Sequence, residues 1–97
     1  MIIVIGSLVV QAGQLEQALG LSLAHVRRSR AEPGCIAHAV HQDAEQPQRL
    51  VFVEQWQDRA ALMAHFKLPQ SRAFVGALSA LATQAPSMGL YEATPMA

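Results

Sequence analysis

Residues 50–66 read LVFVEQWQDRAALMAHF, and this stretch decides the fold because a strand pattern turns directly into a helix pattern. Leu50 to Val53 are all apolar and favour β-structure, so we expect both faces of this strand to be covered. Asp58 follows Trp56 by two residues, where a helix N-cap is expected. The helix that begins there carries Ala61, Leu62, His65 and Phe66 at helical spacing.

The rest of the chain supplies the partners of this strand and helix. Besides 50–56, strands are predicted at 1–10, 35–43 and 88–94. Helices are predicted at 12–29, at 58–68, and from Pro69 to a point before Pro86. The order β, α, β, β, α in two pieces, β predicts an α+β fold, the ferredoxin-like split βαβ sandwich with an antiparallel four-stranded sheet.

The predicted layers leave one face of the sheet bare. In the first helix, Leu15, Leu19, Leu23 and Val26 form one stripe, which we expect to face the sheet. Arg27, Arg28 and Arg30 near its end complement the helix dipole. Right-handed crossovers place all helices on the same face. The strands at 1–10 and 50–53 are apolar at both odd and even positions, whose side chains point to opposite faces of the sheet. We therefore expect a second copy to cover the other face, as a homodimer.

Composition narrows the class of protein. The 97 residues, 52% of them apolar, suit one domain spanning 1–97. Seven basic and seven acidic residues cancel and form no basic stripe, so no nucleic-acid partner is expected. No apolar run has membrane-span length, and no charged segment precedes the first one, so we expect a cytoplasmic protein without a membrane partner. Cys35 is the only cysteine, which favours a small buried hydrophobe over a reactive thiol.

Three motifs together resemble the antibiotic biosynthesis monooxygenase (ABM) family. They are Glu32-Pro-Gly-Cys35, Val53-Glu54-Gln55-Trp56, and the helix from Ala61-Leu62 to His65-Phe66. The resemblance covers essentially the whole chain and implies a dimeric α/β barrel, in which two ferredoxin-like subunits join their sheets. It also implies small-molecule chemistry, because the family includes cofactor-free oxygenases of aromatic polyketides, quinol monooxygenases and haem-degrading enzymes.

Two sites found in the family do not carry over to this chain. The polyketide oxygenases have an asparagine at the position that matches Phe52. The haem-degrading members have an asparagine, a tryptophan and a histidine at the positions that match Gly6, His65 and Val75. This chain contains no asparagine, and the Glu-Gln-Trp strand end and His-Phe helix are most similar to the quinol-monooxygenase-like members.

We expect the functional side chains to line one pocket between the sheet and the helices. Residues two apart on a strand share a face, and the resemblance to the ABM family implies that two sets of three face the helices. These sets are Phe52, Glu54 and Trp56 on one strand and Ile36, His38 and Val40 on its neighbour. His65 follows Leu62 by three residues and points inward as well. The predicted contacts of an aromatic ligand are Phe52, Glu54, Leu62, Phe66 and Phe74.

These residue types suit oxygenation without a metal or other cofactor. Such an enzyme must take a phenolic proton, hold the resulting anion with donors, and exclude water while dioxygen reacts. An imidazole exchanges protons readily near neutral pH, so His65 is the candidate base and His38 the second choice. The indole N–H of Trp56 is a donor, and Glu54 could orient a histidine or stay a buried acid. We therefore predict a cofactor-independent monooxygenase of a quinol-like or polycyclic phenolic compound.

Structural roles remain open for the same residues. Trp56 can anchor the strand–helix corner, and Glu54 can pair with Arg72. His65 can be a satisfied core residue, and Tyr91 can belong to a barrel or interface.

Other active-site patterns are missing, which limits the alternatives for the whole protein. His38 and His41 have a metal-like spacing, but residues three apart on a strand face opposite sides. No glycine-rich phosphate loop follows a strand, and no serine lies in a nucleophile elbow. The alternatives to a monooxygenase are a dimeric binding domain without catalysis and a cofactor-free isomerase of a small carbonyl compound.

Overall fold

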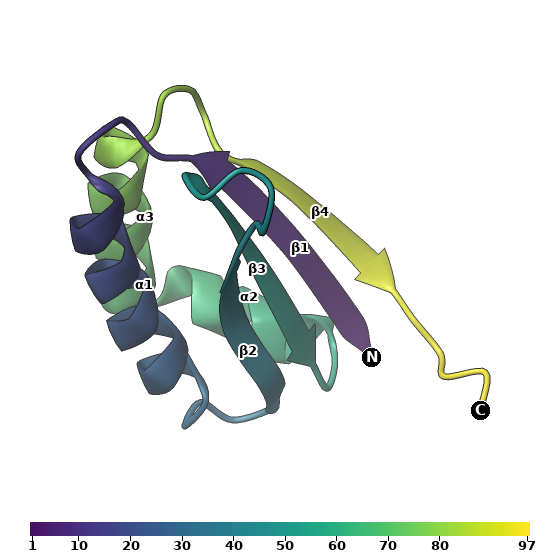
Figure 1. Cartoon of the computed structure of the whole chain (residues 1–97). Helices are drawn as coiled ribbons and strands as arrows, with labels where there is room; N and C mark the ends of the chain where they lie inside the picture. Colours follow the sequence, from purple (N-terminus) through teal and green to yellow (C-terminus); the bar gives the residue numbers. More distant parts are fainter.

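The computed structural model describes residues 1–97, which form a four-stranded antiparallel sheet with helices on one face (Figure 1). The strands are β1 (Ile2–Val9), β2 (Cys35–Gln42), β3 (Arg49–Trp56) and β4 (Ser87–Glu92). The helices are α1 (Leu15–Ser29), α2 (Arg59–Lys67) and α3 (Pro69–Leu81). The strand order across the sheet is β2-β3-β1-β4, which confirms the predicted ferredoxin-like α+β fold.

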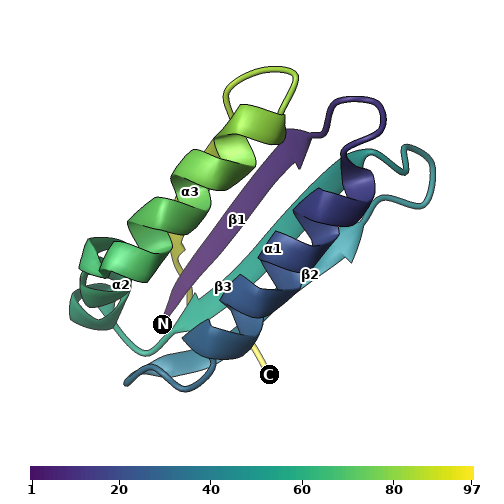
Figure 2. The same cartoon turned by 90° about the vertical axis from the view of Figure 1, so that its left-hand side faces the viewer.

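The helices form one layer. Viewed from the helix side, α1 lies over β2 and β3, α3 lies over β1, and α2 packs at one end of α3 (Figure 2). No element covers the opposite face of the sheet (Figure 1). None of the three helices has the length and apolar character that a bilayer crossing demands.

The core beneath the helices divides into two apolar clusters. The larger one consists of Leu8, Val10, Ala18, Val26, Leu50, Phe52, Leu78 and Ala82. The smaller one consists of Ile2, Val4, Trp56 and Leu62, and Cys35 packs against it. Burial raises the pKa of the Cys35 thiol, which favours the inert protonated form over a nucleophilic thiolate.

Local sequence signals fix the ends of α2 and α3. The Asp58 carboxylate accepts a hydrogen bond from the backbone N–H of Ala61 at 2.8 Å, as the predicted N-cap should. Pro69 is the first residue of α3, where its missing N–H and fixed φ do no harm.

The turn between α1 and β2 requires a glycine. Gly34 has a φ of +81°, and a Cβ built on it would lie 2.5 Å from the Cβ of Ala61. This turn therefore docks closely on α2, and it carries Glu32 toward that helix.

The helices of the chain cover the strands on one face only, so cover of the other face, as expected from the sequence, would need a second copy (Figure 1). In β3, residues alternate between buried and half-buried from Arg49 to Trp56. In β1, Ile5 points away from the helices and is 47% exposed. Only 20 of the 97 residues are buried, although 52% are apolar.

Two of the predicted inward-facing sets are wrong in part. Leu23 is 38% exposed, because α1 turns a different stripe toward the sheet. That stripe consists of Ala18, Ser22, His25, Val26 and Ser29. Ile36 is 54% exposed, because a β-bulge shifts the register of β2 between Cys35 and Ala37. His38 and Val40 keep the predicted face, opposite Glu54 and Phe52 of β3.

Candidate functional site

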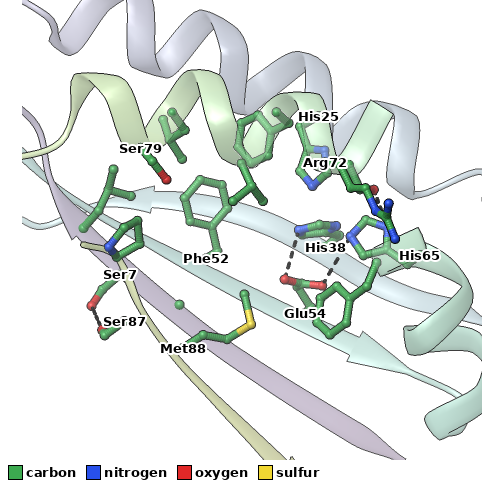
Figure 3. Close-up of a pocket in the computed structure, with 18 residues that line it drawn as sticks. Ser7, His25, His38, Phe52, Glu54, His65, Arg72, Ser79, Ser87 and Met88 are labelled. Atoms are coloured by element: carbon green, nitrogen blue, oxygen red, sulfur yellow. Dashed lines mark hydrogen bonds and ion pairs between the residues drawn. The ribbon is translucent and has the colours of Figure 1, made fainter. Parts of the chain in front are cut away.

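A pocket of about 460 Å³ opens between the helix-covered face of the sheet and the helices (Figure 3). Much of its wall is apolar, formed by Phe52, Phe66, Phe74, Leu78 and Met88 among others. Four buried polar side chains meet at one end of the pocket: His25, His38, Glu54 and His65. The pocket volume of about 460 Å³ falls within the range of roughly 300–1,000 Å³ that is usual for small-molecule sites.

The three histidines come from three different elements. His25 is on α1, His38 on β2 and His65 on α2, and none is more than 5% exposed. The ring centroids lie 5.2 Å apart for His25 and His38, 5.3 Å for His25 and His65, and 5.6 Å for His38 and His65. Such a cluster forms only when the whole chain folds.

The Glu32 carboxylate fixes the tautomer of His65. Oε1 of Glu32 lies 2.7 Å from Nδ1 of His65. Because a carboxylate only accepts hydrogen bonds, Nδ1 carries the proton and Nε2 keeps its lone pair. The Ser71 hydroxyl is also near Nδ1, at 3.5 Å, which is too long for a strong bond. His65 is therefore oriented as a proton acceptor at the polar end of the pocket.

Glu54 is a buried carboxyl group held by the indole of Trp56. Trp56 Nε1–H donates to Oε1 of Glu54 at 2.9 Å. Burial raises the pKa of Glu54, although the Trp56 hydrogen bond and the charge of His65 oppose this rise. Glu54 makes no ion pair with Arg72, which is exposed, so that alternative is wrong. The raised pKa makes Glu54 more readily protonated than an exposed glutamate.

His25 and His38 are neutral imidazoles. The pKa of each is lowered to about 3, chiefly by burial and then by the neighbouring imidazoles and arginines. Arg28 donates to Nδ1 of His25 at 2.8 Å, so the other nitrogen of that ring carries the proton. The His25 ring also stacks on Phe74, with centroids 3.9 Å apart. His38 Nε2 lies 3.6 Å from Oε2 of Glu54, beyond hydrogen-bonding distance.

The structure brings together most of the predicted site residues. His38, Glu54 and His65 meet in the pocket, and Phe52, Phe66 and Phe74 line it (Figure 3).

Trp56, predicted as a hydrogen-bond donor to the ligand, and Leu62, predicted as a ligand contact, lie behind the pocket wall. Trp56 and Leu62 are fully buried in the smaller core cluster and do not line the pocket. Trp56 can influence a bound molecule through Glu54, to which it donates, and through His65, whose ring centroid lies 4.7 Å from that of the indole. His41 is exposed while His38 is buried, as expected for residues three apart on a strand. Tyr91 pairs with Ile3 and is 55% exposed.

Sequence reasoning missed His25 and Glu32. A signal for His25 existed, because Ser22, His25 and Ser29 recur at helical spacing beside Ala18 and Val26. The leucine stripe of α1 pointed instead to a different face. Glu32 lies in one of the quoted motifs, but its contact with His65 joins residues 33 positions apart and has no local signal.

The fold and pocket define a small ferredoxin-like α+β protein with a pocket of the size of small-molecule sites. The chain belongs to the antibiotic biosynthesis monooxygenase family, whose family model matches residues 1–77. This match confirms the resemblance seen in the sequence motifs.

Relatives and solved structures agree with this assignment. An uncharacterized protein of Synechocystis sp., sll1783, is 36% identical over 74 residues, which cover 76% of this chain and 50% of that protein. This chain thus spans about half the length of that relative. A crystal structure of an antibiotic biosynthesis monooxygenase matches with a TM-score of 0.90 at 30% identity, covering 98% of this chain and 100% of the other. A Deinococcus radiodurans protein named for the same family matches with a TM-score of 0.94 at 27% identity, covering 100% and 96%.

Proposed function

We propose that this protein is a cofactor-independent monooxygenase that oxidises a quinol-like or polycyclic phenolic small molecule. The observation that carries the proposal is the Glu32–His65 pair, which holds a base at the polar end of an apolar pocket. Membership of a family described by its monooxygenases supports the reaction class.

In the proposed reaction, the flat rings of the substrate pack among Phe52, Phe74 and Met88. Nε2 of His65 takes the proton, and the Glu32 carboxylate stabilises the imidazolium that forms. The apolar wall excludes water from the resulting anion while dioxygen reacts. The role of the protein is thus to generate and shield an electron-rich anion.

The electrons come from the substrate itself. For an anthrone-like compound, the anion transfers one electron to dioxygen, and the two radicals combine to form a carbon–oxygen bond. Loss of water from the peroxide then leaves a carbonyl group, so the net reaction is R₂CH₂ + O₂ → R₂CO + H₂O. The carboxyl group of Glu54, whose pKa is raised by burial, can supply a proton to the departing oxygen when it is protonated.

Oxygen uptake by the purified, metal-stripped protein tests the proposal. A panel of anthrones and dihydroxynaphthalenes should be oxidised faster than each compound autoxidises. His65→Ala should lower the rate by about 10²- to 10⁴-fold, the usual contribution of a general base. Trp56→Phe, which loses the N–H to Glu54, should reduce the rate less. His41→Ala, at an exposed site, is the matched control. An unchanged rate in a folded His65→Ala protein would refute the proposal.

A cofactor-free isomerase is the second candidate function. Nε2 of His65 lies 3.9 Å from Oε1 of Glu54, so a candidate base and a carboxyl group with a raised pKa stand side by side. Such a pair could remove a proton from a small carbonyl compound and return it elsewhere. Conversion of substrate without oxygen uptake would favour this candidate, and ligand binding with neither would indicate a non-catalytic binding domain.

We also infer that a second copy covers the open face of the sheet. Apolar and aromatic side chains are gathered there without cover from any element of the chain: Ile3, Ile5, Val51, Val53 and Tyr91. A patch of this kind on a small protein favours association. Pairing of two such faces would give the dimeric α/β barrel, with each pocket between its own sheet and helices.

A further inference from the structure

We propose that His25, His38 and His65 form a binding site for a divalent transition-metal ion such as Zn²⁺. The three side chains are buried, and their potential ligand nitrogens all lie within 4.8 Å of one another. Imidazole is a ligand that zinc, copper, nickel and iron all accept. Three protein ligands with one position left open is also the usual arrangement of a reactive zinc site.

His38 supplies an independent reason to expect a ligand. It is only 2% exposed, and neither of its ring nitrogens has a hydrogen-bond partner. A buried polar atom without a partner destabilises the fold, so such atoms are rare in native proteins. A metal ion held among the three imidazoles would satisfy one of these nitrogens.

The cluster needs little movement to close around an ion. Nitrogen atoms at the corners of a triangle of side 4.8 Å lie just under 3 Å from its centre. Zinc–nitrogen bonds are about 2.0–2.1 Å long, so each nitrogen must move inward by less than about 1 Å. Small rotations of the three side chains can achieve this.

The surroundings also suit a metal site. The Glu32 carboxylate holds Nδ1–H of His65, the type of outer contact that orients metal-bound histidines. Glu54 lies 3.6 Å from His38 and 3.9 Å from His65, within reach as a fourth ligand.

Arg28 competes with the ion for His25. It donates to Nδ1 of His25, so that nitrogen uses its lone pair in this structure. If Nδ1 binds the ion, the hydrogen bond must break. If Nε2 binds, Nδ1 must take up the proton, and Arg28 can no longer donate to it. Metal binding therefore requires the Arg28–His25 bond to open, and Arg28 is exposed and free to move.

The metal site does not depend on the proposed oxygenase reaction, but it would affect that reaction. An ion on His65 uses the lone pair that would otherwise accept the substrate proton. Metal binding and base catalysis by His65 would then exclude each other, a consequence that rests on the proposed function.

Co²⁺ titration of the chelator-treated protein tests the site directly, since Co²⁺ replaces Zn²⁺ and gives visible absorption bands when bound. We expect bands that saturate at one ion per chain and disappear when Zn²⁺ is added. His38→Gln should weaken binding by more than about 100-fold, because even changes to outer contacts weaken it tenfold to 100-fold. His41→Gln should bind like the parent protein. Arg28→Met should bind about tenfold more tightly, because one charged hydrogen bond no longer opposes the ion.

Three results would overturn the metal site. The first is the absence of bands at about 1 mM Co²⁺, a concentration far above the dissociation constants of structural metal sites. The others are bands that persist in a folded His38→Gln protein, and no gain in affinity for Arg28→Met. The last variant changes an exposed side chain, so it remains informative if a buried histidine variant fails to fold. Bands without oxygen uptake would support the metal site and contradict the proposed oxygenase. Oxygen uptake without bands would support the oxygenase and contradict the metal site.

Discussion

The face of the sheet beneath the helices and the face turned away from them hold opposite kinds of side chain. Beneath the helices, His38 and Glu54 are 2% and 5% exposed. On the other face, Ile5 and Tyr91 are 47% and 55% exposed. The same strands create both surfaces, since alternate residues point to opposite sides.

Each face departs in a different way from the usual arrangement of buried apolar and exposed polar side chains. The covered face indicates a candidate site, and the open face indicates a surface suited to association. Buried polar groups without full hydrogen bonding destabilise a fold, so their presence indicates a site. Exposed apolar groups lose nothing within the chain but favour contact with another surface. The covered face thus loses stability at the residues of the candidate site, and the open face is suited to gain stability through association.

A charge on the open face should have the largest effect, because it would disrupt the proposed contact between two copies. Ile5→Asp would bury an unpaired carboxylate in the proposed dimer, at a cost of several kcal/mol. We expect the dimer dissociation constant to rise by at least about 1,000-fold, measured by sedimentation equilibrium. Leu23→Asp changes an exposed residue of the helix layer and is the control. A parent protein that sediments as a monomer at micromolar concentration would contradict the proposed dimer.

Lowering the pH should reduce the free energy of unfolding through the buried histidines of the covered face. The pKa values of His25 and His38 are lowered to about 3, so below pH 6.5 the unfolded chain binds protons that the folded chain does not. Stability should be complete above pH 6.5 and fall toward pH 3, by at most about 1.4 kcal/mol per pH unit for each histidine.

Urea unfolding at a fixed protein concentration checks this slope. Glu54 acts in the opposite sense, because its pKa is raised and acid relieves its burial, so the comparison of variants is essential. His38→Gln should flatten the slope, whereas His41→Gln, at an exposed site, should leave it unchanged. Equal slopes for the two variants would show that the buried histidines do not control acid stability.

Two serines of α1 give the smallest and most closely matched test. The Ser22 hydroxyl is buried without a hydrogen-bond partner, whereas the Ser29 hydroxyl donates to the carbonyl of His25 at 2.8 Å. Both substitutions to alanine change helix propensity equally. Ser22→Ala should therefore be more stable than Ser29→Ala by about 1–2 kcal/mol in the free energy of unfolding. The same stability for both variants would mean that Ser22 is satisfied in solution.

The sequence predicted the fold well because its signals are local. The N-cap at Asp58, the proline that starts α3 and the glycine turn at Gly34 each act within a few residues. The failures have physical causes too. The β-bulge that exposes Ile36 is a property of two paired strands, so no pattern within β2 alone predicts it.

The site was predicted only where it lies on strands or on a strongly apolar helix face. His38 and Glu54 followed from period-two alternation, and His65 from its apolar neighbours. His25 was hidden because the leucines of α1 outweigh its polar stripe, yet that stripe faces the sheet. The burial of Trp56 behind Glu54 depends on packing with Ile2 and Val4, which are far away in the chain.

The polar loop between β2 and β3 divides the site into two halves. Residues before it carry His25, Glu32 and His38, and residues after it carry Glu54, Trp56 and His65. Neither segment holds a complete base, because the Glu32–His65 hydrogen bond crosses the loop. A chain cut in this loop would regain the proposed base only when the two fragments recombine, so the proposed activity would serve as a reporter of fragment complementation.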